Sequence, residues 1–359
     1  MKLHRLIAIA ICLCAIVNIS LSAQTDKKEL GFVARVQKVV STEFLPVSRN
    51  DDRMVKQNQV IIVFDEAGNI LEESLEGKTN NLILYKSVET KGENKIHRVK
   101  LFDDRGVLNS LSVLAFDKAN QMQLAKYFDC ENNLTSQINV TINEKGTPTS
   151  LTWFDADEQL IGKKVYTYEN DKLALIETVD NSIQGHWKSN TVTYFDYDGK
   201  GNLTLVRNLT ADGILIDVTE FKYNIKGDKI KSIFYPNYLS DSSERYENTY
   251  DGAGLLSKTT YYSPDNRVVR DENYSRSREG YLTAFAVYQD FKGDLLPDYV
   301  QGFNAKGNDI RRIRYDGTGE LYDFIDVVYK YDAYNNWVEK IEKSGREVIA
   351  LTKRVITYY

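Results

Sequence analysis

The hydrophobic residues of this chain follow a short pattern that recurs from about residue 60 almost to the C-terminus. Each copy has an aromatic residue, an aspartate, two variable positions, a glycine or asparagine, and an apolar residue six places after the aromatic. The clearest copy is Tyr197-Asp198-Gly199-Lys200-Gly201-Asn202-Leu203. An Asp-x-x-Gly sequence favours a type I turn whose glycine is left-handed, followed by a β-bulge. The pattern therefore predicts a β-hairpin in which Tyr197 lies opposite Leu203.

Facing residues of a hairpin share one side of the sheet, so both ends of the six-residue offset should be apolar. Most copies agree with this expectation. The agreeing pairs are Phe64 with Ile70, Phe102 with Leu108, Phe116 with Met122, Phe128 with Leu134, Phe154 with Leu160, Tyr250 with Leu256, Tyr262 with Val268, Tyr315 with Leu321 and Tyr331 with Trp337. Two copies depart from it, Tyr223 with Lys229 and Ile142 with Pro148. The chain is therefore a tandem array of hairpins.

The spacing of the copies gives the strand length and the fold class. Successive anchors lie near residues 64, 76, 90, 102, 116, 128, 142, 154 and 168, and later near 197, 209, 223, 235, 250 and 262. Most steps are 12 or 14 residues, so one repeat is a hairpin of about 26 residues with two turns. Regular turns between short strands predict an all-β antiparallel meander. We expect an N-terminal cap hairpin at residues 24–59 and the repeat array at residues 60–359.

The faces of this sheet are predicted from the parity of the steps. Because the steps of 12 and 14 residues are even and strand side chains alternate, the aromatic anchors should lie on one face. Charged residues such as Lys231 and Arg311 occur between them, and the other face is also mixed. We therefore expect a long twisted or spiralling sheet with two partly wet faces. An outer-membrane barrel is disfavoured because Ile310–Arg314 carries charge on both faces, where a lipid-facing side should be apolar.

The first 23 residues have the layout of a secretory signal peptide. Lys2 and Arg5 precede an apolar run from Leu6 to Val17, and small residues end at Ala23. That run is too short to span a bilayer comfortably. We therefore expect a secreted, periplasmic or cell-surface protein with no membrane span in its mature chain.

Composition excludes several classes of function. Removing residues 1–23 takes away two bases and no acid, so the formal net charge changes from −5 to −7, which argues against a nucleic-acid partner. Cys130 is then the only cysteine, in a variable turn position, and His97 and His186 are the only histidines. This small number of histidines disfavours a histidine-based catalytic or metal site. We expect no catalytic residue, no metal and no cofactor.

The tandem copies resemble the YD repeats of the RHS family. The best matches are the copy at Tyr197 with the following Tyr223-Asn224, and the copy at Tyr331-Asp332-Ala333-Tyr334-Asn335-Asn336-Trp337. The resemblance covers most of residues 60–345. It implies a spiralling β-sheet shell, which in that family encloses a toxin or binds cell surfaces and sugars. We carry over the strand-and-turn architecture.

The sequence favours a non-enzymatic binding or structural module whose partner is a glycan or a surface protein. Tyrosine is frequent at 24 residues, so rows of rings could stack on sugars, and the candidates are Tyr168, Tyr197, Tyr223, Tyr250 and Tyr331. The simpler interpretation is that aromatic pairs across strands hold the sheet together. The alternative function is a carbohydrate-active enzyme that uses a turn carboxylate pair, such as Asp155 with Asp157 or Asp316 with Glu320.

Overall fold

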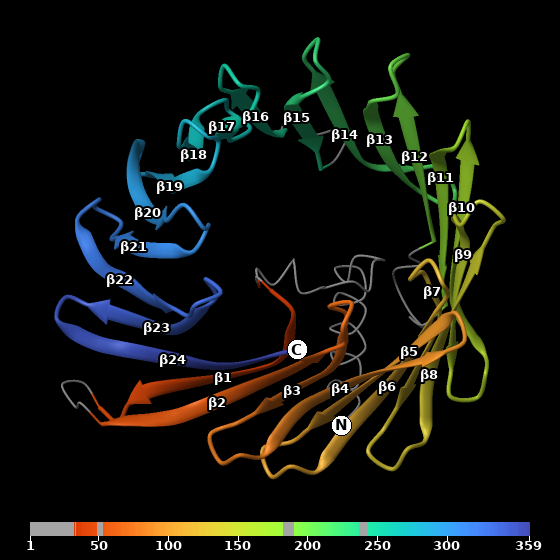
Figure 1. Ribbon diagram of the computed structural model, residues 1–359. Coiled ribbons are helices and arrows are strands. Elements are labelled where there is room, and N and C mark those ends of the chain that lie inside the picture. The colour runs from red at the N-terminus through yellow and green to blue at the C-terminus, as the bar shows by residue number, and fades with distance from the viewer. Residues whose placement is uncertain (1–31, 33, 49–52, 182–189, 237–242) are drawn as a thin grey trace.

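The computed structural model is a single antiparallel sheet bent into a ring (Figure 1). It describes residue 32 and residues 34–48, 53–181, 190–236 and 243–359. The signal peptide and His186 lie outside these ranges. The strands are β1 (Val36–Pro46), β2 (Met54–Phe64), β3 (Ile70–Glu76), β4 (Leu82–Lys91), β5 (Asn94–Phe102), β6 (Leu108–Phe116), β7 (Met122–Phe128), β8 (Leu134–Ile142), β9 (Pro148–Asp155), β10 (Leu160–Glu169), β11 (Lys172–Asp180), β12 (Thr191–Tyr197), β13 (Leu203–Thr210), β14 (Leu215–Tyr223), β15 (Lys229–Tyr235), β16 (Glu244–Tyr250), β17 (Leu256–Tyr262), β18 (Val268–Arg276), β19 (Leu282–Phe291), β20 (Asp294–Phe303), β21 (Asp309–Tyr315), β22 (Leu321–Tyr331), β23 (Trp337–Ser344) and β24 (Glu347–Tyr358).

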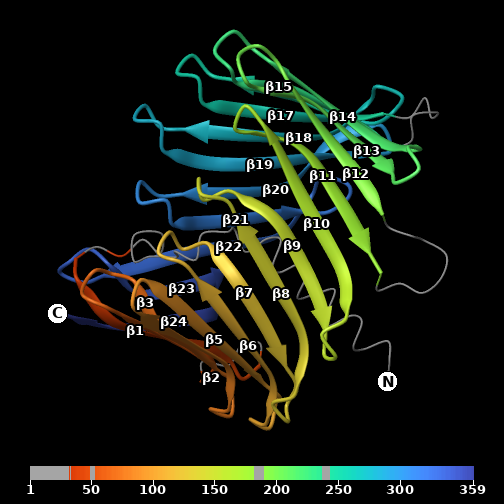
Figure 2. The same cartoon turned by 90° about the vertical axis from the view of Figure 1, so that its right-hand side faces the viewer.

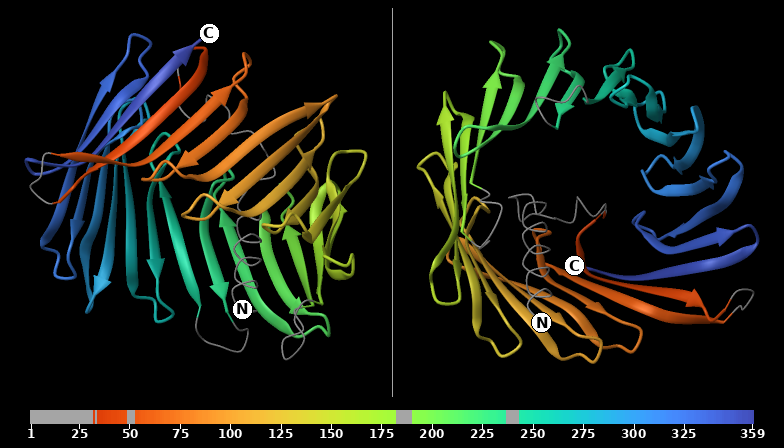
Figure 3. Two further views of the ribbon diagram at one scale, coloured as in Figure 1. Left: turned by 90° about the horizontal axis from the view of Figure 1, so that it is seen from below. Right: turned by 180° about the vertical axis from the view of Figure 1, so that it is seen from behind.

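The all-β meander of hairpins is confirmed, but the sheet closes on itself, so the long twisted or spiralling sheet expected from the sequence is wrong. Each strand pairs with the next along the chain, and β1 also pairs with β24 from Val36↔Tyr358 to Phe44↔Leu351. This last ladder closes the ring (Figure 3). The expected boundary between residues 59 and 60 falls inside β2. Among the residues that the structure describes, the closed sheet has no free edge strand to pair with another chain.

The predicted turn and its register are confirmed. Tyr197 pairs with Leu203, and the two departing copies follow the same register, as Tyr223↔Lys229 and Ile142↔Pro148. In the turn, the amide of Asp198 donates to the carbonyl of Asn202 at 2.9 Å. Gly201 has a φ of +89°, and asparagines such as Asn120 and Asn335 hold the same turn position with positive φ in other copies. Six-residue spacing thus fixes the pairing even where one member is not apolar.

A second β-bulge overturns the expectation that all anchors share one face. Tyr197 pairs with Leu203, but the preceding Asp196 pairs with Leu205, so one residue of β13 is left over. The Thr204 hydroxyl donates to the Asp196 carbonyl at 3.1 Å at this bulge. One extra residue in a strand reverses which of its following side chains face inward and which face outward. Two anchors that are an even number of residues apart therefore lie on opposite faces when a bulge falls between them.

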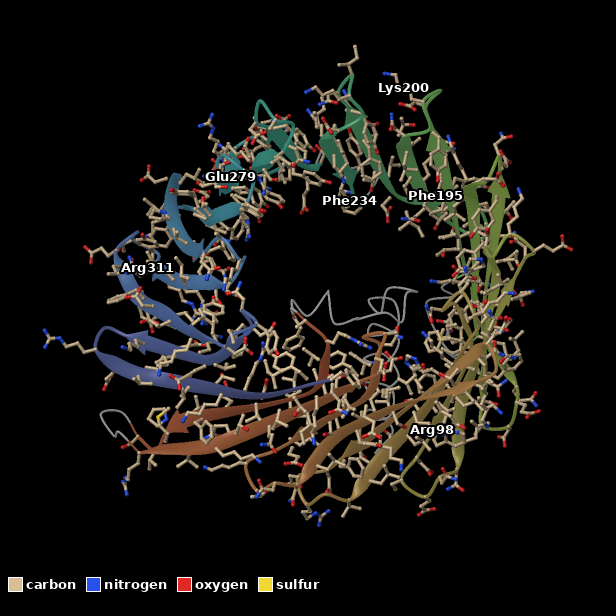
Figure 4. All side chains as sticks on the ribbon, viewed as in Figure 1. Arg98, Phe195, Lys200, Phe234, Glu279 and Arg311 are labelled. Atoms are coloured by element: carbon tan, nitrogen blue, oxygen red, sulfur yellow. The ribbon has the colours of Figure 1, made fainter. Side chains whose placement is uncertain are left out.

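The anchors therefore divide between the two rims of the ring. Even-numbered strands end at one rim, here called the even rim, and odd-numbered strands end at the other, the odd rim. Figure 4 shows Phe195 and Phe234 pointing into the ring and Arg311 lying on its outside. Paired residues share a face, so the strand registers extend the direction of Phe195 to the anchors. Anchors at the even rim, such as Tyr197 and Phe64, face inward, whereas anchors at the odd rim, such as Phe102, face outward.

Two clusters of buried side chains lie on the inner face. One buried cluster contains Phe116, Met122, Ala125, Ile138 and Val140. A second contains Phe32, Val36, Val39 and Phe64 and lies where β1 and β2 meet β24. Strands β7–β12 cross the wall at an angle to β17–β21 on the opposite side (Figure 2). A ring of 24 strands would measure roughly 45 Å between opposite backbones if it were round.

The described residues contain no helix whose length and hydropathy would let it span a membrane.

The turn assignment gives a testable difference between adjacent residues. Replacing Gly201 with valine should cost on the order of 1–3 kcal/mol, because a β-branched residue is strained at positive φ. A Cβ at this position would also lie 2.5 Å from the Lys172 ammonium, which would have to move. Lys200→Ala, on a neighbouring exposed turn residue, should change the unfolding free energy by less than about 0.5 kcal/mol. Urea denaturation and hydrogen exchange would compare the variants, and equal effects would contradict the assigned turn.

Candidate functional site

The five tyrosines predicted as binding residues all lie on the inner face at the even rim. Four of them, Tyr168, Tyr197, Tyr223 and Tyr250, end the alternate strands β10, β12, β14 and β16. They form an arc along the rim. Tyr331 ends β22, three even-numbered strands beyond the arc. The structure therefore brings four of the predicted residues together and leaves the fifth apart.

Three tyrosines of this arc use their hydroxyl groups to connect neighbouring hairpins. The hydroxyls of Tyr197, Tyr223 and Tyr250 donate to the carbonyls of Leu173, Leu203 and Lys229 at 3.0, 2.8 and 2.8 Å. Each acceptor is near the start of the preceding strand, beyond the last ladder pair between the two strands. The tyrosine thus donates to a carbonyl that lies beyond the end of the ladder between the two strands. These contacts agree with the simpler interpretation, in which the anchors hold the sheet together.

The ring faces of the anchors are also partly occupied. The Lys172 ammonium lies 5.1 Å from the centre of the Tyr197 ring, and the Lys306 ammonium lies 3.4 Å from that of Tyr331. The side-chain amide of Asn308 donates to the Tyr331 hydroxyl at 3.0 Å. Burial raises the pKa of Tyr168. A ligand at the even rim would therefore have to displace existing contacts.

A second set of inward-facing rings lies away from the rim and was not predicted. We call it the inner aromatic band, and it consists of Phe221, Tyr246, Tyr261, Tyr274 and Phe285, on β14 and β16–β19. Tyr246 pairs with Tyr261, with ring centres 5.9 Å apart, and Tyr274 pairs with Phe285 at 5.2 Å. All five side chains are half-buried, so part of each remains open to the inside of the ring.

Cations and one carboxylate accompany the band. The Lys229 ammonium lies 5.2 Å from the Phe221 ring centre and 5.4 Å from that of Tyr246. Arg270 forms an ion pair with Glu272 at 2.6 Å, and Glu272 accepts a hydrogen bond from the Tyr274 hydroxyl at 2.9 Å. Burial and this carboxylate raise the pKa of Tyr274 to about 12, so the phenol stays protonated at neutral pH. The band therefore combines apolar ring surface with donors and acceptors.

The band could have been found from sequence only if the second bulge had been recognised. Tyr246 lies four residues before the anchor Tyr250 on the same strand, so parity alone places it on the anchor face. Tyr261, on the next strand, directly precedes the anchor Tyr262, and simple alternation would place it opposite Tyr246. The bulge after Leu256 brings the two tyrosines to one face.

The carboxylate pairs of the alternative enzyme hypothesis are engaged in turn structure. Asp155 accepts hydrogen bonds from the amides of Asp157 and Gln159 at 3.0 and 2.8 Å. Asp316 accepts from the amides of Thr318 and Glu320 and from the Thr318 hydroxyl. These bonds lower the pKa of Asp316. A glycosidase acid needs a raised pKa instead, so Asp316 is poorly suited to that role.

The remaining candidates give no further site. Cys130 is an exposed free thiol. His97 is buried at 5% exposure against the Phe116 ring. In the described ranges, no group of three or more histidine, cysteine, aspartate or glutamate residues is arranged to hold a metal ion.

Comparisons with known proteins give structural similarities only. No protein-family model and no curated protein matches the chain. A chain of the Photorhabdus luminescens Tc holotoxin pore is 8% identical with a TM-score of 0.29, over 88% of this chain and 27% of that chain. A chain of a TcdB2–TccC3–Cdc42 structure is 10% identical with a TM-score of 0.23, over 85% and 23%. A porin-like protein from Bacteroides uniformis is 8% identical with a TM-score of 0.28, over 91% and 98%. The chain spans about a quarter of the length of the two toxin-related chains.

Proposed function

We propose that this protein is an exported, non-enzymatic binding module with a YD-like repeat architecture, and that its inner wall binds glycans. The observation that carries the proposal is the inner aromatic band. The aromatic side chains of the band are half-buried and face the inside of the closed sheet. Sugars present apolar C–H faces beside hydroxyl groups, so rings flanked by Lys229, Arg270 and Glu272 suit them in both respects.

The rim tyrosines differ from the tyrosines of the inner aromatic band in the partners of their hydroxyl groups. The hydroxyls of Tyr197, Tyr223 and Tyr250 already bind backbone carbonyls, so removal of these side chains should mainly weaken the sheet. In the described part of the chain, the hydroxyls of Tyr246 and Tyr261 donate to no backbone carbonyl. The two classes of tyrosine therefore separate a structural effect from a binding effect.

A glycan panel tests the proposal. The mature protein would be incubated with immobilised glycans, and both retention and product formation would be scored. We expect retention without turnover, and Tyr246→Ala or Tyr261→Ala should weaken it at least tenfold. Tyr194→Ala is the matched control, because this tyrosine is 40% exposed on the outer face. Turnover that disappears on changing Asp316 would favour the carbohydrate-active enzyme instead, and an empty panel would refute glycan binding.

Export is proposed from the charged and apolar start of the chain and has its own measurement. Mass spectrometry of the protein from cells should find a mature N-terminus at Ala23 or Gln24 outside the cytoplasm. Cytosolic material that retains Met1 would contradict it.

A further inference from the structure

Arg354 is a half-buried arginine on the inner face of β24, beside the ladder that closes the ring. It pairs across the closure with Ser41 of β1. Its guanidinium lies 3.3 Å from the centre of the Trp337 ring and 5.1 Å from that of Phe32. The Nε group donates to the Ser41 hydroxyl at 3.0 Å. The two aromatic rings and the serine therefore fix the orientation of the guanidinium.

The other half-buried arginines of the inner wall have compensating partners. Arg312 forms ion pairs with Glu342 at 2.6 Å and with Asp309 at 3.0 Å, and Arg270 forms one with Glu272. Arg276 lies at hydrogen-bonding distance from the carbonyls of Gly280 and Leu256. Buried charges are normally compensated in this way, because removing a charge from water is costly.

Arg354 differs from these arginines. Within the described ranges, no carboxylate forms an ion pair with it, and no group accepts a hydrogen bond from its two terminal amino groups, Nη1 and Nη2. Burial lowers its pKa to about 10. The neighbouring ionisable group that acts on the pKa of Arg354 is the Tyr329 phenol, which acts to raise it. That phenol donates to Asp309 at 2.8 Å, and burial and this carboxylate raise its pKa, so it is neutral at pH 7. Arg354 is therefore an oriented cation with aromatic neighbours and no carboxylate partner among the described residues.

We propose that Arg354 binds the carboxylate of an acidic sugar through its two terminal amino groups. With Nε held by Ser41, the end of the guanidinium remains for a two-bond contact, the geometry that arginine uses for carboxylates. Trp337 and Tyr329, whose ring centres are 5.8 Å apart, supply apolar surface beside it. This inference rests on the proposed glycan binding and specifies acidic glycans as the ligand class.

Calorimetry with three oligosaccharides tests the assignment. The probes are a tetramer of galacturonic acid, the methyl ester of the same tetramer, and the neutral galactose tetramer. Wild-type protein should bind the acid at least tenfold more tightly than the ester. Arg354→Gln should abolish that preference. Arg354→Lys should retain part of it, because lysine keeps the charge but loses the planar fork. Lys353→Gln removes the same charge one residue away, on the outer face, and should retain the full preference.

The outcomes separate this inference from the proposed function. Equal binding of acid and ester, or a preference that survives Arg354→Gln, overturns the Arg354 assignment and leaves glycan binding intact. Binding of neutral glycans alone has the same consequence. Failure of every glycan on the panel overturns both. Circular dichroism and thermal melting would confirm that the variants fold, and if Arg354→Gln does not fold, Arg354→Lys decides the question.

Discussion

Replacing Phe64 with alanine should destabilise the protein by about 3–5 kcal/mol, the usual cost of deleting a fully buried ring. Phe64 is 1% exposed and packs with Phe32, Val36 and Val39. Its carbonyl also accepts a hydrogen bond from the Tyr359 hydroxyl at 2.6 Å. The residue thus joins β2 to the strands that close the ring. Urea denaturation would measure the loss, and hydrogen exchange should rise first in β1, β2 and β24.

Phe102→Ala is the matched control for this prediction. Phe102 is the equivalent anchor of another hairpin and pairs with Leu108 in the same register. It faces outward at the odd rim and is only half-buried, so its loss should cost about 1 kcal/mol. If both substitutions cost the same, the division of anchors between inner and outer faces is incorrect. If exchange instead rises evenly around the ring, the closure is not a separate cooperative unit.

The local part of the fold could be predicted because the turn chemistry is local. A glycine or asparagine at positive φ sets the hairpin register, and this held even for Tyr223 opposite Lys229. Ring closure could not be predicted in this way. Val36 and Tyr358 pair although they are more than 300 residues apart, and neither carries a turn signal. Closure follows from the accumulated twist and curvature of 24 strands, which no single repeat displays.

The candidate site was predicted only in part for a related reason. The anchor positions of Tyr197, Tyr223 and Tyr250 were visible as a pattern, but their hydrogen bonds to the preceding strand depend on where each ladder ends. The inner aromatic band depends on bulges that have no fixed residue type. Thr204 marks one bulge and Ser257 another, each by donating to a carbonyl of the neighbouring strand. Serine and threonine are too common in strands to serve as a sequence signal.

His97 should make the stability of the ring depend on pH. The side chain faces inward from β5, between Val88 of β4 and Leu114 of β6, and its ring centre is 4.6 Å from that of Phe116. The charged groups near it are the lysines Lys86 and Lys95. Burial, with a smaller contribution from these lysines, lowers the pKa of His97 from 6.5 to about 4. The folded protein therefore keeps this imidazole neutral well below the pH at which an unfolded chain protonates it.

The sign of the effect follows from proton linkage. Between pH 6.5 and about 4 the unfolded chain binds a proton at this position and the folded chain does not, so the unfolding free energy falls as the pH is lowered. A shift of this size corresponds to about 3 kcal/mol in total, and the contribution of His97 stops changing below about pH 4. His97→Leu should abolish this dependence while leaving stability at pH 7.5 nearly unchanged, because leucine fills a similar volume without a titrating group. Urea denaturation of both proteins at half-unit steps from pH 7.5 to 4 would measure the difference. Parallel curves for wild type and variant would mean that the imidazole is protonated in the folded ring, and that the buried position assigned to it is incorrect.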